Sequence, residues 1–347
     1  MAGQEIIVVG ASSGGIEALK ELVRGLPSGF PVSLFVVCHF PAGARSALPE
    51  ILSRAGPLLA THAEDGEPFY PGHIYIAPPD WHLMVGPDRR IRLSKAAREN
   101  RHRPAIDPLF RSAARHYGPR AIGLILSGSL SDGVAGLLAI QMAGGLTIVQ
   151  EPNDAIIADL PRNAIRVVSA DHVAPAADLA ALLTSIVQQE IAPNRSSPMS
   201  DPINAMQDVV EHDMAQQSRD ERQGQVSVFT CPECGGALWQ VRQQELVQFR
   251  CHVGHVYNGE VLLAEQSEAL EAALWTAVRT FREQSILASQ LAHRVRAAGN
   301  VDSADRFAEQ SRQAARYGSL IQQLLLNGDP EGGDPTKPGA ANSIDVS

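Results

Sequence analysis

Residues 1–190 alternate short, fully apolar runs with stretches of helical periodicity, and this alternation constrains the fold more than any other feature. Runs such as Ile6–Val9 and Leu34–Cys38 contain no charged position, which is typical of strands that helices cover on both faces. Gly and Pro separate these runs from helical segments such as Ile16–Leu26. The pattern predicts an α/β domain: a doubly wound, mainly parallel sheet with helices on both faces.

The same patterns predict the remaining elements of this domain. Further strands are expected at His73–Ala77, Ile91–Ser94, Ile122–Leu126 and Leu146–Gln150. Helices are expected to begin near Ala47–Ser53 and to span Pro108–His116 and Val134–Ala143. A turn-rich stretch, Pro78–Asp88, is expected between two of these strands.

A serine, a histidine and an aspartate each follow a different predicted strand. Ser12 lies in the turn Gly10–Gly15, His39 directly follows the second strand, and Asp132 follows the strand that ends at Leu126. Ligands of open parallel sheets bind beyond the carboxyl ends of the strands. We therefore expect these three side chains to converge although they are far apart in the sequence.

These three residue types together form a nucleophilic site. A serine hydroxyl becomes an effective nucleophile when an imidazole removes its proton, and a carboxylate on the other ring nitrogen fixes the tautomer. Ser12 is the predicted nucleophile, His39 the base and Asp132 the orienting carboxylate. The amides of Gly14 and Gly15 open the following helix and are predicted to donate to a developing oxyanion.

A glycine-rich turn between strand and helix also occurs in phosphate-binding and dinucleotide-binding sites. The turn Gly10–Gly15 lacks the middle glycine of G-x-G-x-x-G, and no Lys-Ser/Thr pair follows it to make a P-loop. His39, instead of an acid, ends the second strand. Alone, His39 could be a surface residue and Asp132 a helix cap. Their equivalent positions after separate strands favour the nucleophilic site.

At these residues the chain resembles the catalytic domain of the CheB-type chemotaxis methylesterases. The resemblance extends from Ile6 to Ile186. It is carried, in order, by Val9–Gly15, Cys38–Pro41, Ala63–Gly66, Tyr75–Asp80, Asn100–Pro104 and Ser131–Gly136.

The resemblance implies hydrolysis of γ-glutamyl methyl esters on the cytoplasmic helices of methylated chemoreceptors, with release of methanol. It also implies deamidation of receptor glutamines in many members. The family nucleophile, base and carboxylate correspond to Ser12, His39 and Asp132. Ser13 stands where the family commonly has threonine, and Ser129 where it often has a methionine whose backbone helps bind the oxyanion.

The basic turn Arg101-His102-Arg103 has two interpretations. It is either a solvated loop held by Asp107 or a clamp that docks on an acidic, helical receptor surface.

Three cysteines and two histidines cluster later in the chain. Cys231 and Cys234 form a C-x-x-C, and Cys251 is followed closely by His252 and His255. The spacing predicts a closed structural Zn²⁺ site, against the alternative of a reduced dithiol in a small core.

The predicted ligands are Cys231, Cys234, Cys251 and His255, with His252 as the competing fourth ligand. Four protein ligands leave no open position, so no cofactor is expected for catalysis. Similar zinc ribbons with a helical hairpin follow some CheB-like domains. That resemblance implies an interaction module for a signalling-protein partner.

Five segments are predicted along the chain. Residues 1–190 are the catalytic domain, 191–226 a flexible linker, 227–258 the zinc-ribbon-like module, 259–327 a helical hairpin and 328–347 a disordered tail. No second α/β unit carries the acid cluster of a receiver domain, so control by phosphorylation in cis is not expected.

The bulk composition excludes several classes of partner. The formal net charge of −9 argues against nucleic acid, and no apolar run is long enough for membrane insertion. The cysteine usage and the absence of a basic, apolar leader favour the cytoplasm. Two other functions remain open: a serine esterase with a target outside chemotaxis, and a non-catalytic signalling scaffold of the same fold.

Overall fold

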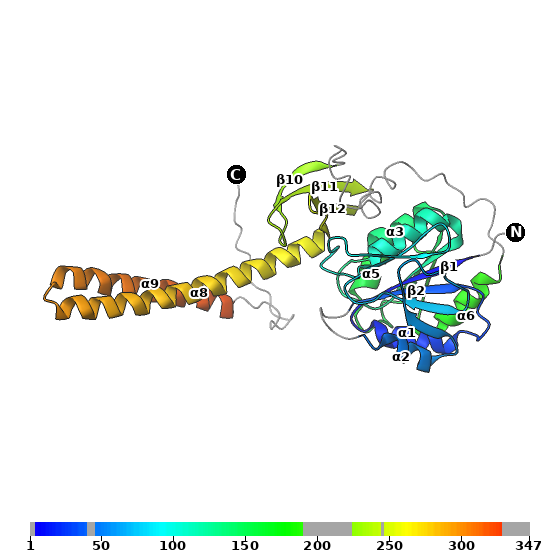
Figure 1. The fold of residues 1–347 in the computed structure, drawn as a ribbon, viewed down its shortest axis with the longest axis horizontal. Helices are drawn as coiled ribbons and strands as arrows, with labels where there is room; N and C mark the ends of the chain where they lie inside the picture. The colour runs from blue at the N-terminus through cyan, green and yellow to red at the C-terminus, as the bar shows by residue number, and fades with distance from the viewer. Residues whose placement is uncertain (1–3, 40–45, 190–223, 244–245, 328–347) are drawn as a thin grey trace, which may run out of the picture. The chain divides into compact units, whose positions relative to one another are not determined.

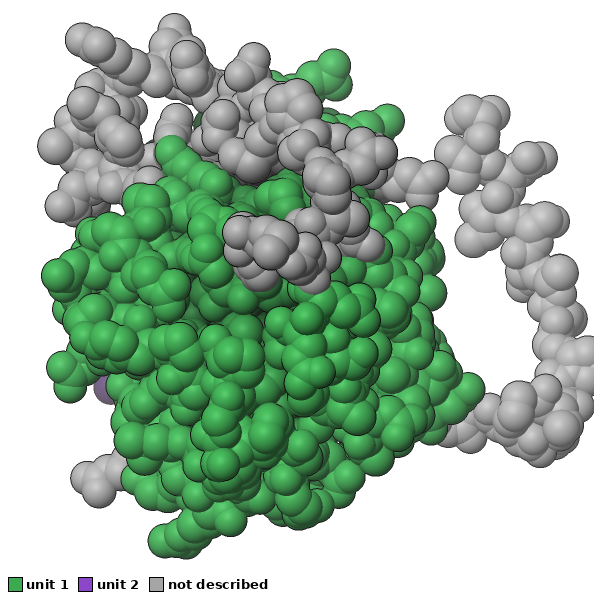
Figure 2. Space-filling view, turned by 90° about the vertical axis from the view of Figure 1, so that its right-hand side faces the viewer, with its two compact units in different colours: residues 1–263 green, residues 264–347 purple. Residues whose placement is uncertain are grey.

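The computed structural model describes residues 4–39, 46–189, 224–243 and 246–327. The predicted tail and almost all of the predicted linker therefore lie outside the described residues. The described chain divides into two compact units, Met1–Leu263 and Ala264–Ser347, which Figure 2 colours separately. Among the described helices, none is both long and apolar enough to cross a membrane.

A seven-stranded, entirely parallel sheet forms the centre of the first unit (Figure 1). The strand order is β3-β4-β2-β1-β7-β8-β9, so the order reverses beside β1, the kind of position at which open parallel sheets bind ligands. The strands are β1 (Ile6–Ala11), β2 (Ser33–Cys38), β3 (Leu59–His62), β4 (His73–Ile76), β7 (Ala121–Ile125), β8 (Leu146–Gln150) and β9 (His172–Ala174).

Helices cover both faces of this sheet (Figure 1). Alternate residues of β1 enter opposite cores: Ile6 and Val8 face one set of helices, Ile7 and Val9 the other. One set is α1 (Gly15–Gly25), α2 (Leu48–Ala55) and α6 (Ala176–Val187); the other is α3 (Ile106–Tyr117), α4 (Val134–Met142) and α5 (Asp159–Val167). The predicted doubly wound parallel fold is confirmed.

The predicted turn-rich stretch Pro78–Asp88 contains a strand that the sequence did not indicate. Strand β5 (His82–Val85) pairs antiparallel with β6 (Ile91–Ser94), outside the main sheet. The segment is only four residues long, and turn residues flank it: Pro and Asp before it, and Gly, Pro and Asp after it, so the sequence carries no clear strand signal. The expectation of a continuous turn region is wrong.

The Cys/His segment folds into a four-stranded antiparallel sheet, which we call the ribbon module (224–258). Its small core includes Leu238, Phe249 and Tyr257. Its first strand begins at Gln225, so the first two residues of that strand fall within the predicted linker 191–226. The strands are β10 (Gln225–Thr230), β11 (Ala237–Gln243), β12 (Leu246–Cys251) and β13 (Val256–Asn258).

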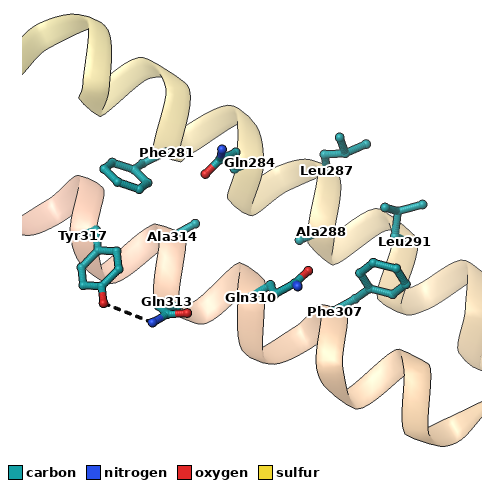
Figure 3. A pocket seen from close by; sticks show the side chains of 10 residues that line it. All are labelled: Phe281, Gln284, Leu287, Ala288, Leu291, Phe307, Gln310, Gln313, Ala314 and Tyr317. Carbon is teal, nitrogen blue, oxygen red and sulfur yellow. Dashed lines mark hydrogen bonds between the residues drawn. The ribbon is translucent and has the colours of Figure 1, made fainter. Parts of the chain in front are cut away.

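Two long helices, α8 (Gly259–Ala297) and α9 (Val301–Asn327), make up the predicted hairpin. The chain turns at Gly299, whose φ of 86° favours glycine. Apolar residues of the two helices face one another around a shallow pocket (Figure 3). Within it the rings of Phe281 and Tyr317 lie 5.7 Å apart.

Candidate active site

The turn after β1 holds Ser12 at the carboxyl edge of the sheet. The Ser12 amide donates to the Ser127 carbonyl at 3.0 Å, and the Gly15 amide donates to the Ser12 carbonyl at 2.9 Å. Gly14 has a φ of 75°, and a Cβ on it would lie 2.8 Å from the Ser127 hydroxyl oxygen. Only glycine fits at position 14, which explains why a glycine follows the two serines of the turn.

Ser12, His39 and Asp132 converge as predicted. The Nδ1 atom of His39 lies 3.1 Å from Ser12 Oγ, and its Nε2 lies 2.9 Å from Asp132 Oδ2. The side chains of His39 and Asp132 are only 7% and 3% exposed. With the ring proton on Nε2 facing the carboxylate, Nδ1 is left to accept the serine proton.

Asp132 is buried, and three groups donate hydrogen bonds to it. The donors are His39 Nε2, the Ile106 amide at 2.6 Å and Asn100 Nδ2 at 3.0 Å. Burial alone would raise the pKa of Asp132, but the hydrogen bond and charge of His39 outweigh it and hold this pKa well below its usual value. The carboxylate is therefore ionised at neutral pH.

Asn100 is a site residue that the sequence did not single out. Its side chain is fully buried, and Nδ2 donates to both Asp132 and Asp107 at 3.0 Å. It lies within a segment that carries the family resemblance, which was its only signal in the sequence.

His102 lies against the imidazole of His39. Its ring stacks on that of His39, with centroids 3.5 Å apart and planes 11° from parallel. Burial, and then the charge of His39, lower the pKa of His102 to about 3. His102 is thus neutral at ordinary pH and forms one wall of the site, a contact that its place in the basic turn did not indicate.

Arg103 is held by an acid other than the one proposed from the sequence. Its Nε and Nη2 lie 2.9 and 2.7 Å from Asp80 Oδ1. Asp107 instead is buried and accepts hydrogen bonds from Asn100 and from the Gly136 amide. Asp107 thus holds Asn100, the residue before the turn, whereas Asp80 holds Arg103. Docking of receptor by this turn stays a prediction.

Of the two predicted oxyanion donors, the amides of Gly14 and Gly15, only that of Gly14 is available to a ligand. The Gly15 amide is used within the turn. Within the described part of the chain, the amides of Ser13, Gly14 and Ser129 form no hydrogen bond. These three amides remain the candidates for binding an oxyanion.

The predicted metal ligands Cys231, Cys234, Cys251 and His255 lie together, with ligand atoms all within 4.8 Å of one another. His255 Nδ1 is 3.6 and 3.5 Å from the sulfurs of Cys231 and Cys251, and the sulfurs of Cys234 and Cys251 are 3.7 Å apart. A tetrahedral Zn²⁺ ion requires about 3.6 Å for sulfur–nitrogen pairs and about 3.8 Å for sulfur pairs. These residues could hold a metal ion.

The competing ligand His252 is exposed and is not part of this group. His255 also has an orienting partner, because Glu233 Oε2 lies 3.2 Å from its Nε2. Such a carboxylate turns the other ring nitrogen, Nδ1, toward a metal.

The model of the family described as CheB methylesterase matches residues 7–183, half of the chain. The chain belongs to the CheB methylesterase family. The matched part holds the whole serine, histidine and aspartate site and ends before the ribbon module.

Related proteins are named protein-glutamate methylesterase/protein-glutamine glutaminase. The one from Photorhabdus laumondii is 39% identical over 50% of this chain and 50% of its own. One from Myxococcus xanthus is 41% identical over 52% of this chain and 51% of its own. One from Pseudomonas aeruginosa is 37% identical over 56% of this chain and 56% of its own. The matches thus span about half the length of these curated relatives.

A solved structure, the CheB methylesterase catalytic domain of Thermotoga maritima, matches with a TM-score of 0.52 and 33% identity. The match covers 54% of this chain and 100% of that one. The parallel α/β domain therefore has the CheB catalytic fold.

Proposed function

We propose that this chain is a carboxylic-ester hydrolase that removes methyl groups from γ-glutamyl methyl esters on the cytoplasmic helices of chemoreceptors. The observation that carries the proposal is the pair of hydrogen bonds at the His39 ring: Nδ1 accepts from Ser12 Oγ at 3.1 Å, and Nε2 donates to Asp132 Oδ2 at 2.9 Å. Membership of the CheB family and the names of the relatives support the choice of substrate.

The geometry supports a two-step acyl transfer. The Ser12 hydroxyl gives its proton to His39 Nδ1 while its oxygen attacks the ester carbon. The oxyanion that forms accepts hydrogen bonds from the amides of Ser13, Gly14 and Ser129. The intermediate collapses, the C–OCH₃ bond breaks, and His39 returns the proton so that methanol leaves.

Water then hydrolyses the acyl-serine. His39 takes a proton from the water, hydroxide adds to the acyl carbon, and the Ser12 oxygen leaves with the proton held by the imidazole. The product is a free glutamate side chain. A glutamine would follow the same path with ammonia as the first leaving group, so deamidation belongs to the same proposal.

Ionised Asp132 stabilises the imidazolium that forms in both steps. The stacked, neutral His102 excludes water from one face of the ring without adding a second positive charge. We include the turn Arg101–Arg103 in the proposal as the surface that docks an acidic receptor helix.

The ribbon module is proposed to bind a structural Zn²⁺ ion through Cys231, Cys234, Cys251 and His255. The chemistry of the donor set fits, because thiolate and imidazole are the ligands that Zn²⁺ prefers. Bound there, the ion would cross-link the two turns of the module. No step of ester hydrolysis passes through it.

The test compares two substrates for the purified, zinc-loaded protein. Methanol release is measured from methylated chemoreceptor membranes, and chromophore release from p-nitrophenyl acetate. The proposal predicts release from both. Turnover of the small ester without any methanol from receptors would favour an esterase with another target, and inactivity on both would favour a scaffold.

A further inference from the structure

The ribbon module contacts the loops that carry the carboxylate side of the active site. Within the first unit, the backbone N–H of Asn100 donates to the Val256 carbonyl at 2.7 Å. The backbone N–H of Asn258 donates to the side-chain Oδ1 of Asn100 at 2.9 Å. Strand β13 is thus hydrogen-bonded to the residue that bridges Asp132 and Asp107.

These contacts decide which way the Asn100 amide faces. Because Oδ1 accepts from a backbone N–H of the module, the NH₂ group must point at the two carboxylates. The reversed amide would place its oxygen against ionised Asp132 and its NH₂ against the Asn258 N–H. The module therefore keeps a donor on the carboxylate that orients His39.

A second set of contacts holds the loop before Asp132. Asn258 Nδ2 donates to the Ser131 carbonyl at 3.0 Å, and Gln248 Nε2 fixes Asn258 by donating to its Oδ1 at 3.0 Å. Leu130, from the same loop, packs on the core of the module.

Both loops contain residues in an unusual backbone conformation. Asn100 has a φ of 48° and Leu130 a φ of 60°, values that non-glycine residues rarely adopt. Such conformations persist when the surroundings determine them, and here β13 supplies part of those surroundings.

The metal ligands lie beside these contacts. Cys251 ends β12 and His255 directly precedes β13, and the Cys251 amide donates to the His255 carbonyl at 3.0 Å. An ion bound to both would fix the turn that places Val256 and Asn258 against the catalytic loops.

We propose that the ribbon module is a support of the active site: Asn100 and Asn258 are positioning residues for Asp132, and metal binding to the module sustains ester hydrolysis. The inference rests on the proposed esterase activity. A supporting module affects the hydrolysis of small esters as much as the hydrolysis of receptor methyl esters. A module that recruits receptor would affect only the second.

The first experiment compares full-length Asn258→Ala with Gln225→Ala, an exposed amide of the same module. Asn258→Ala removes the donor to Ser131 and the acceptor of Gln248. It is expected to lower kcat on p-nitrophenyl acetate about tenfold, as the loss of one hydrogen bond to the loop before Asp132 predicts, with KM nearly unchanged. The low-field NMR signal of the His39 Nε2 proton should shift or broaden. Gln225→Ala should match wild type.

Asn100→Ala removes the side chain that bridges Asp132 and Asp107, and it should lower kcat more than Asn258→Ala does. A folded Asn258→Ala protein with the wild-type kcat and an unchanged low-field signal would overturn the proposal. So would a loss confined to receptor membranes, since that indicates recruitment.

Metal removal provides a test that needs no substitution. The rate at which a fluorophosphonate labels Ser12 is measured in the wild-type protein after chelation and again after Zn²⁺ is restored. The proposal predicts a fall of about tenfold and recovery. Full-rate labelling of metal-free protein would refute it. Labelling uses no receptor, so a failure of the methylesterase assignment would appear separately, as labelling without methanol release.

Discussion

Asp132→Asn should nearly abolish hydrolysis although it changes only one atom of the side chain. The carboxylate accepts from His39 and Ile106 on one oxygen and from Asn100 on the other. An asparagine has one oxygen and one NH₂ group, so it cannot satisfy donors on both sides.

Either orientation of the new amide harms the site. With its oxygen toward His39, its NH₂ faces the NH₂ of Asn100, and the negative charge that stabilises the imidazolium is lost. With its NH₂ toward His39, Nε2 must accept, so the ring proton moves to Nδ1 and the imidazole cannot take the proton of Ser12.

Loss of the correct tautomer in a serine triad costs about 10⁴-fold in kcat, which corresponds to about 5.5 kcal/mol of transition-state stabilisation. The assay is turnover of p-nitrophenyl acetate, with folding checked by circular dichroism. Asp178→Asn, an exposed aspartate in the first turn of α6, is the matched control. If folded Asp132→Asn kept more than about a tenth of the wild-type rate, the assigned role of the carboxylate would be wrong.

Three further predictions concern the basic turn, the metal and pH. Arg103→Ala should reduce methanol release from receptor membranes far more than turnover of a small ester, and equal losses would exclude docking by this turn. His255→Ala should lower the Zn²⁺ content measured by mass spectrometry, whereas His252→Ala should not. Unfolded chain protonates His102 near pH 6.5 and folded protein only near pH 3, so protonation destabilises the fold as pH falls between these values. His102→Gln should therefore flatten the fall of Tm across that window, and an unchanged slope would contradict the buried, neutral ring.

The features that the sequence predicted are those with a local signal. Apolar runs bounded by Gly and Pro located the central strands, and the position of Ser12, His39 and Asp132 after three of them sufficed to bring the triad together. The C-x-x-C and the spacing to His255 likewise located the Cys/His group that could hold a metal ion.

The features that it missed depend on contacts between distant segments. Asn258 reaches Asn100 across 158 positions, and nothing near either asparagine indicates the other. His102 stacks on His39 because two loops meet above the sheet. Strand β5 has only four residues and is closely flanked by turn residues, so its sequence shows no strand-like alternation of apolar and polar positions.

The most direct test of the central claim is methanol release from methylated chemoreceptor membranes by wild type, Ser12→Ala and Ser13→Ala. The two serines are adjacent, but only Ser12 lies 3.1 Å from His39 Nδ1. We predict release by wild type, none above background by Ser12→Ala, and substantial release by Ser13→Ala, whose backbone amide is kept. Release by folded Ser12→Ala at the wild-type rate would contradict the account.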